Sequence, residues 1–141
     1  YITRNATLSQ YLVDTNHLSP LVTSGHPLRE IIYHRLEAGD SFAIATPVLS
    51  ELLFGIRSVP RATQNLQQWR VLRKYFAIYD VTEQIAEEAA ELRSNLRRRG
   101  WQLNIIDSFI AVIALHNHQI LLTTDADFQG IPDLLQENWR T

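Results

Sequence analysis

The feature that most constrains this chain is residues 11–13, an uninterrupted Tyr-Leu-Val run followed at once by Asp14, Thr15 and Asn16. A short apolar run of this kind is typical of a strand that is buried on both faces, as in a parallel sheet. The polar triplet then falls where the strand leaves the sheet at its carboxyl end. Because open α/β sheets bind ligands along that edge, we expect a functional site around Asp14.

The rest of the sequence alternates between strand and helix patterns. Strand patterns occupy residues 41–45, 77–80 and 120–123, and helix patterns occupy residues 27–38, 46–56, 60–76, 82–99 and 104–115. This alternation predicts an α/β fold, a single-domain three-layer α/β/α arrangement with a central parallel sheet. We expect residues 1–10 to be a disordered or vector-derived lead and residues 11–141 to form the domain. The tail after residue 131 is expected to add one edge element.

Capping residues mark where the helices begin. Thr46, Thr82 and Asn104 are predicted N-caps, because a hydroxyl or amide oxygen at that position accepts hydrogen bonds from the first unpaired N–H groups. Thr15 or Asn16 is predicted to cap a short helix directly after the first strand.

The composition limits the possible partners and chemistry. The net charge of −2 argues neither for nor against a nucleic-acid partner. Lys74 is the only lysine beside twelve arginines, and Arg suits phosphate and base recognition, although compositional drift gives the same count. The absence of Cys excludes disulfides, zinc–thiolate sites and thiol catalysis. It also fits a reducing compartment, so we expect a cytoplasmic protein, and no apolar run approaches the roughly 18 residues of a membrane span.

Four acidic residues are placed where they can converge. Asp14 ends the first strand, Asp125 follows the strand at residues 120–123, Glu51 lies in the helix after the second strand, and Asp107 opens a nearly all-apolar helix. In a parallel sheet all strand exits lie on one side. Clustered carboxylates repel one another, and a divalent cation neutralises them. Carboxylates without Cys favour Mg²⁺ or Mn²⁺.

Each acid also has a purely structural explanation. Asp107 fits a capping-box acid, Glu51 a half-exposed helix residue and Asp125 a turn residue. Asp14 is the hardest to explain in this way, because an acid next to a buried strand needs a partner. The joint placement of all four favours the functional interpretation.

The histidines and a basic helix end are weaker candidates. His116 and His118 are interpreted as cap or surface residues, since a spacing of two does not place them on one helical face. His17 could contact a substrate, but a surface helix position is the preferred interpretation. Arg93 and Arg97 form an i, i+4 pair that could contact an RNA backbone, and a solvated helix end explains them equally well.

Four segments in order resemble the PIN domain, and more narrowly the VapC-type toxins of bacterial toxin–antitoxin pairs. They are residues 12–16 (Leu-Val-Asp-Thr-Asn), residues 50–55 (Ser-Glu-Leu-Leu-Phe-Gly), Asp107 with residues 109–111 (Phe-Ile-Ala), and residues 122–128 (Leu-Thr-Thr-Asp-Ala-Asp-Phe). The resemblance spans residues 11–130. One position departs from it: many relatives have Asn immediately before the third acid, where this chain has Ile106.

The resemblance implies a Mg²⁺- or Mn²⁺-dependent endoribonuclease. The implied acid quartet is Asp14, Glu51, Asp107 and Asp125, with Thr15, Asn16, Thr124 and Asp127 in support. Asp14 and Asp107 are our choice for direct metal ligands, and Glu51 and Asp125 would ligate the metal or hold metal-bound water. Asp127 lies close enough in sequence to exchange roles with Asp125. Catalysis would use water activated by the metal to attack the scissile phosphate. RNA with an accessible single-stranded loop is the expected substrate, with tRNA as one option.

The resemblance further implies a homodimer and a cognate antitoxin that places a peptide in the active-site groove. Two alternatives stay open, a PIN-type nuclease of RNA processing and a non-catalytic PIN-like binding scaffold. Two other phosphotransfer classes fit less well. A response-regulator receiver needs a Lys near its end, whereas Lys74 lies mid-chain, and an Asp-nucleophile phosphatase needs a second acid where Asn16 stands.

Overall fold

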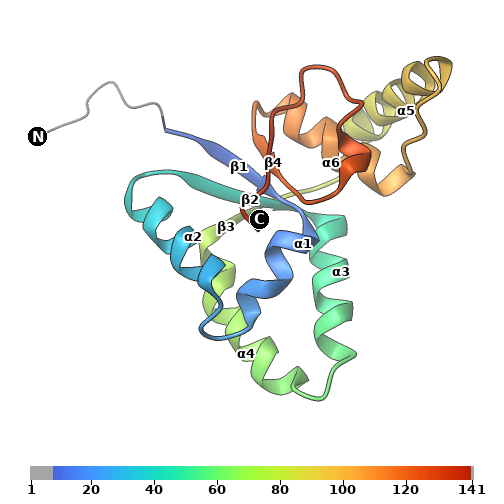
Figure 1. The fold of residues 1–141 in the computed structure, drawn as a ribbon. Helices are drawn as coiled ribbons and strands as arrows, with labels where there is room; N and C mark the ends of the chain where they lie inside the picture. The colour runs from blue at the N-terminus through green and yellow to red at the C-terminus, as the bar shows by residue number, and fades with distance from the viewer. Residues whose placement is uncertain (1–7, 141) are drawn as a thin grey trace, which may run out of the picture.

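A five-stranded, all-parallel sheet forms the centre of the protein in the computed structural model, which describes residues 8–140 (Figure 1). The strands are β1 (Gln10–Val13), β2 (Ser41–Ala45), β3 (Phe76–Tyr79), β4 (Ile120–Leu122) and β5 (Gln136–Glu137), in the order β3-β2-β1-β4-β5. The predicted parallel α/β sheet is therefore confirmed. The predicted edge element in the tail is β5. Of the predicted lead, residues 1–7 lie outside the described residues, and Gln10 belongs to β1.

Helices cover both faces of this sheet. They are α1 (Thr15–Leu18), α2 (Pro27–Glu37), α3 (Thr46–Arg57), α4 (Ala62–Leu72), α5 (Glu83–Arg98) and α6 (Ile105–His116), with single 3₁₀ turns at Ser19–Val22, Arg73–Tyr75 and Ala126–Phe128. Parallel crossovers are right-handed, so α1 to α4, which connect β1 to β2 and β2 to β3, lie on one face. The chain then reverses direction in the sheet, and α5 and α6 cover the opposite face (Figure 1). Within residues 8–140, no helix combines the length and the apolar character that crossing a membrane requires.

The sheet interior is apolar on both sides, as the sequence predicts. Tyr11, Leu12 and Val13 are at most 2% exposed. Leu12 is in register with Ala43 of β2 and with Leu121 of β4, so β1 is the central strand of the sheet. Burying this strand from both faces stabilises the arrangement through the hydrophobic effect, at about 25 cal/mol per Å² of apolar surface.

The capping predictions are correct at two positions and wrong at two. Thr82 Oγ1 accepts a hydrogen bond from the Ile85 N–H (3.2 Å), and Asn104 Oδ1 accepts one from the Asp107 N–H (2.8 Å). Thr46 is the first residue of α3 and not its N-cap, because the chain already turns at Ala45. The cap of α1 is Asp14 itself, whose carboxylate accepts from the Thr15 N–H. Neither Thr15 nor Asn16 has that role.

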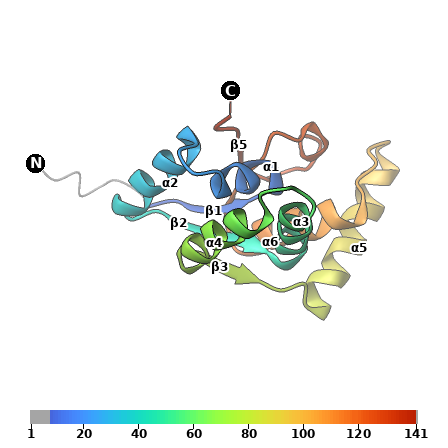
Figure 2. The same cartoon turned by 90° about the horizontal axis from the view of Figure 1, so that it is seen from below.

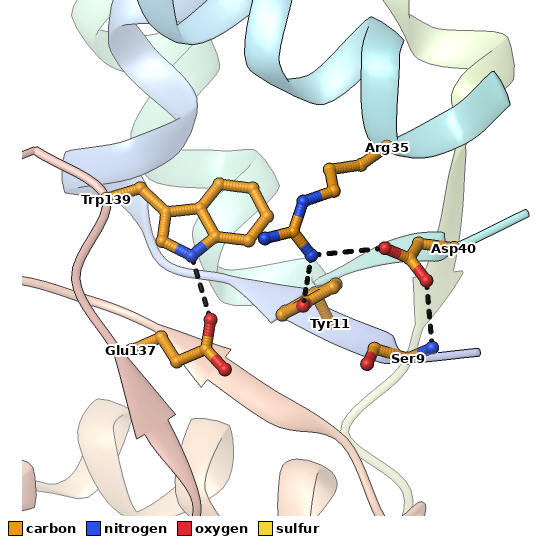
Figure 3. Close-up of polar contacts among 6 residues, drawn as sticks. All are labelled: Ser9, Tyr11, Arg35, Asp40, Glu137 and Trp139. Carbon is orange, nitrogen blue, oxygen red and sulfur yellow. Dashed lines mark hydrogen bonds and ion pairs between the residues drawn. The ribbon is translucent and has the colours of Figure 1, made fainter. Parts of the chain in front are cut away.

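The C-terminal segment is fixed across the start of β1 (Figure 3). The Arg35 guanidinium lies 4.9 Å from the centre of the Trp139 ring and donates hydrogen bonds to the Tyr11 hydroxyl (2.9 Å) and to Asp40 (3.3 Å). The Trp139 ring in turn meets the Tyr11 ring edge-on, with centroids 4.9 Å apart. These contacts bring the end of the described chain next to α1 (Figure 2), where the backbone N–H of Trp139 donates to His17 Nε2 (2.9 Å).

Candidate active site

The predicted acids meet at the point where the strand order reverses. The connections from β1 to β2 and from β2 to β3 lead to one side of β1, whereas β4 pairs with β1 on its other side. This arrangement leaves a crevice beyond the carboxyl ends of β1 and β4. Asp14 follows β1 directly and Asp125 follows β4. A cavity of about 340 Å³ lies there and is lined by Asp14, Thr15, Asn16, Ser19, Glu51, Asp107 and Asp125. The structure therefore brings all four predicted acids together.

Asp14 is buried and is held by three hydrogen bonds. Its Oδ1 accepts from the Thr15 N–H (2.8 Å), and its Oδ2 accepts from the Thr123 hydroxyl (2.8 Å) and from Asn16 Nδ2 (3.2 Å). Burial raises the pKa of Asp14 above its usual value, and the charges of Glu51 and Asp125 raise it further, although the bonds from Thr123 and Thr15 oppose the shift. A nearby cation would relieve this unfavourable burial of charge.

Glu51 reaches the cavity from α3 on the neighbouring crossover. The Thr15 hydroxyl donates a hydrogen bond to Glu51 Oε1 at 3.0 Å. This contact joins the first turn of α1 to α3 and fixes one carboxylate oxygen of Glu51 near Asp14. Thr15, to which the resemblance gives a supporting role, therefore contacts one of the four acids directly.

Asp107 serves both as a capping-box acid and as a member of the acid cluster. Its N–H donates to Asn104 Oδ1, and its Oδ2 accepts from Asn104 Nδ2 (2.9 Å). Burial, followed by the charges of Asp125 and Asp14, raises the pKa of Asp107 to about 6, although the bond from Asn104 opposes the shift. The two interpretations of this residue are therefore compatible, because the cap orients the same carboxylate toward the other acids.

Asp127 lies next to two members of the cluster, Asp107 and Asp125. Carboxylate oxygens of Asp107, Asp125 and Asp127 all lie within 4.8 Å of one another, which is close enough for one cation to bind all three. Asp125 Oδ1 accepts a hydrogen bond from the Asp127 N–H (2.9 Å), so the 3₁₀ turn after β4 sets their spacing.

Thr123 contacts the acids through its side chain and was not predicted from the sequence, which pointed to its neighbour Thr124. The Thr123 side chain is buried, donates to Asp14 and accepts from the Asp125 N–H (3.0 Å). Thr124 contributes its backbone N–H to Asn16 Oδ1 (3.1 Å). The alternation of side chains along β4 could have indicated that Thr123 and not Thr124 faces the same side as Leu121.

The interpretation of His17 as a surface residue is wrong. Its side chain is buried, Nδ1 lies 2.8 Å from Asn16 Oδ1, and Nε2 accepts from the Trp139 N–H. Burial, with the charge of Arg140 adding to it, lowers the pKa of His17 to about 4. The ring is therefore neutral at pH 7 with its proton on Nδ1, and it orients Asn16.

The two histidines at the end of α6 are surface residues, as predicted. His116 is the last residue of the helix and lies 3.6 Å from Glu88, and His118 is exposed. Arg93 and Arg97 lie on α5 and line a separate cavity that adjoins the acids through Asn104 and Asp127.

The donor set fits a hard divalent cation. It consists of carboxylates with hydroxyl and amide groups, and the chain has no Cys. Mg²⁺ and Mn²⁺ prefer such oxygen ligands. The fold and the site thus define an α/β domain with an acid cluster at its topological switch point that could hold a divalent metal ion. The chain belongs to the PIN domain family, whose model matches residues 11–134.

Known relatives of this chain are named as ribonucleases. Ribonuclease VapC2 of Rickettsia felis is 29% identical over 133 residues, which cover 92% of this chain and 97% of the relative. Ribonuclease VapC4 of Mycobacterium tuberculosis is 30% identical over 99 residues, which cover 69% of this chain and 76% of the relative. The crystal structure of VapBC2 from Rickettsia felis, bound to a DNA fragment from its promoter, is similar with a TM-score of 0.80 at 25% identity, covering 92% of this chain and 98% of that one.

Proposed function

We propose that this protein is a Mg²⁺- or Mn²⁺-dependent endoribonuclease and the toxin of a toxin–antitoxin pair. The observation that carries the proposal is the convergence of Asp14, Glu51, Asp107 and Asp125 in one cavity of a PIN domain. The names of the VapC relatives and the VapBC complex support the ribonuclease activity and the antitoxin partner. A homodimer, RNA as the substrate and a cytoplasmic location are parts of the same proposal.

The proposed chemistry is hydrolysis of a phosphodiester bond by water. A bound divalent cation supplies Lewis-acid stabilisation of the phosphate and lowers the pKa of water. Asp14 and Asp107 are the proposed ligands, and the spacing of the acids adds Asp127 as a third candidate. Glu51 and Asp125 accept hydrogen bonds from the attacking water and orient it in line with the leaving oxygen. Because Thr15 engages Glu51 Oε1, Oε2 is the oxygen we assign to that role.

The supporting residues hold the carboxylates in place before substrate binds. Asn16 joins Asp14 to the backbone of Thr124, and Thr123 joins Asp14 to the backbone of Asp125. Such preorganised contacts keep the ligands in the geometry that the reaction needs, so no reorganisation is required during the reaction.

The experiment that tests this function is cleavage of a pool of structured RNAs by purified protein in Mn²⁺, Mg²⁺ or EDTA. We expect site-selective cutting that requires metal and is abolished by Asp14→Asn. Asp80→Asn is the matched control, because Asp80 is an exposed acid outside the cavity. Cutting that persists in EDTA or in Asp14→Asn would point to a contaminating nuclease. Absence of both cutting and metal binding would favour the non-catalytic scaffold.

A further inference from the structure

A second cavity, of about 640 Å³, opens beside the acid cluster, and its volume lies within the roughly 300–1,000 Å³ typical of small-ligand sites. It is formed by one side of α5, the segment before α6 and the turn after β4. The lining residues are Ala90, Arg93, Ser94, Arg97, Trp101, Gln102, Leu103, Asn104 and Asp127. The role that we assign to this cavity rests on the proposed nuclease function.

The cavity and the acid cluster share a wall. Asn104 lines the cavity and donates a hydrogen bond to Asp107 Oδ2. Asp127 also lines it, and its carboxylate lies within 4.8 Å of those of Asp107 and Asp125. A polynucleotide whose scissile phosphate lies on the acids therefore has its next nucleotide within reach of this cavity.

The Trp101 ring is fixed in the wall of the cavity. Its Nε1 donates a hydrogen bond to the carbonyl oxygen of Asp127 (2.9 Å). The ring also lies against Gly130, where a Cβ atom would collide with it, so the glycine is what allows the indole to take this position. An aromatic ring held rigidly in this way offers a stacking surface to an unpaired base, and such stacking tolerates any base identity.

Two arginines of α5 supply positive charge to the lining of the cavity. Arg93 Nε donates to the Leu103 carbonyl oxygen (3.0 Å), which fixes its guanidinium at the cavity wall. Within residues 8–140 the ion pairs are Arg35–Asp40 and His116–Glu88, so neither Arg93 nor Arg97 is neutralised by a carboxylate there. Guanidinium groups bind phosphate oxygens with paired hydrogen bonds and offset the repulsion between RNA and the acids.

We propose that this Trp101 cavity is a nucleotide subsite, which stacks an unpaired base next to the cut site on Trp101 and binds the adjoining phosphate through Arg97 and Arg93. An acidic peptide would use the two arginines but would gain little from a rigid indole. The combination of a fixed aromatic ring with unpaired guanidinium groups therefore favours a nucleotide. The subsite sets where the proposed nuclease cuts, because the acids themselves contact only phosphate.

The test measures RNA binding separately from cleavage. The dissociation constant of a fluorescently labelled RNA hairpin is measured by anisotropy in EDTA, and KM and kcat are measured in Mn²⁺. We expect Trp101→Ala to weaken binding roughly 5- to 150-fold, the range for one stacked base, and Trp101→Phe to retain most of the affinity. Arg97→Ala also weakens binding, and its loss shrinks at high salt. Arg98→Ala is the matched control, since Arg98 lies on the same helix, outside the cavity, and donates to Asn95 Oδ1.

The site of cutting gives a second, independent readout. Changing the nucleotide next to the cut site should alter cleavage by the wild type and have less effect on Trp101→Ala. Thermal unfolding monitored by circular dichroism confirms that each variant is folded. If Trp101→Ala does not fold, Arg97→Ala, at an exposed position on the cavity lining, decides the matter.

The outcomes distinguish failure of this proposal from failure of the proposed function. If the wild type cuts RNA in a metal-dependent way but Trp101→Ala and Arg97→Ala both bind and cut like it, as the Arg98→Ala control does, the subsite is wrong and the nuclease stands. If Arg97→Ala and Trp101→Ala bind RNA normally but lose an acidic antitoxin peptide, the cavity belongs to that partner and the proposal is overturned. If the wild type neither binds nor cuts RNA, both fail together.

Discussion

The Thr123 hydroxyl donates a 2.8 Å hydrogen bond to Asp14 Oδ2 across 109 residues of sequence. Thr123 Oγ1 in turn accepts a hydrogen bond from the Asp125 N–H. One buried hydroxyl therefore connects the acid after β1 to the acid after β4, and the relative position of these two carboxylates depends on it.

We predict that Thr123→Val weakens the site without removing any acid. Val has nearly the shape of Thr but cannot donate to Asp14 or accept from Asp125, so a buried carboxylate loses a partner. Loss of such a supporting contact costs about 10- to 100-fold in metal affinity or activity, and the free energy of unfolding should fall by about 1–3 kcal/mol. Isothermal titration with Mn²⁺ and urea denaturation measure the two effects.

The control for that variant is Thr124→Val. Thr124 is exposed and contributes its backbone N–H to Asn16, which Val retains. Equal effects of the two substitutions would mean that the Thr123 hydroxyl has no special role.

We predict that stabilisation by metal rises with pH around the pKa of Asp107. Its pKa is raised to about 6, so between the ordinary value of 3.8 and about 6 the folded state binds the extra proton. The metal-free protein should accordingly lose stability as pH rises through this window. A cation needs the deprotonated carboxylate, so the increase in melting temperature on adding Mn²⁺ should be small near pH 5 and reach its full size above about pH 7.

Melting temperatures with and without Mn²⁺ across this range provide the measurement. Asp107→Asn should flatten the pH dependence of the metal-free protein and reduce the effect of Mn²⁺. An increase caused by Mn²⁺ that does not change with pH would contradict the assignment of Asp107 as a ligand.

His17 is predicted to have the opposite pH dependence. Its folded pKa of about 4 lies below the ordinary 6.5, so the unfolded chain binds the extra proton between these values. The contribution of His17 is complete above pH 6.5 and is lost as pH falls toward 4. His17→Leu should remove this pH dependence of stability. It should also lower the free energy of unfolding by about 1–3 kcal/mol, because the backbone N–H of Trp139 loses its acceptor.

The matched control for His17 is His118→Asn. His118 is exposed and has a φ of 54°, a backbone conformation that Asn tolerates. Urea denaturation of both variants at several pH values separates the buried histidine from the exposed one. A pH dependence that is unchanged in His17→Leu would show that another group causes it.

Arg35→Lys is predicted to loosen the C-terminal segment while the charge is kept. Lys cannot stack on Trp139 and donate to Tyr11 and Asp40 at the same time, whereas the planar guanidinium does so (Figure 3). We expect the free energy of unfolding to fall by about 1–2 kcal/mol. Urea midpoints measure the loss, and Arg57→Lys, at an exposed position at the end of α3, should leave the midpoint unchanged. Equal midpoints for Arg35→Lys and the wild type would refute the prediction.

What the sequence predicts well is local. The apolar run at residues 11–13, the capping residues Thr82 and Asn104 and the acid at each strand exit depend on neighbours in the chain, so the sheet and the convergence of the acids follow from them. The distinction between Thr123 and Thr124, and the burial of His17, depend on partners more than 100 residues away. Such contacts leave no periodic pattern, because each is a single pairing made by the tertiary fold.

The spread of the acids along the chain has a consequence for the synthesis of the protein. Asp14 and Glu51 leave the ribosome early, whereas Asp125 and Asp127 are added only after most of the chain has been made. A nascent chain that stops before β4 carries Asp14, Glu51 and Asp107 but lacks Asp125, Asp127 and the Thr123 hydroxyl that holds Asp14. The complete acid cluster can therefore form only after β4 and the turn that follows it have been synthesised.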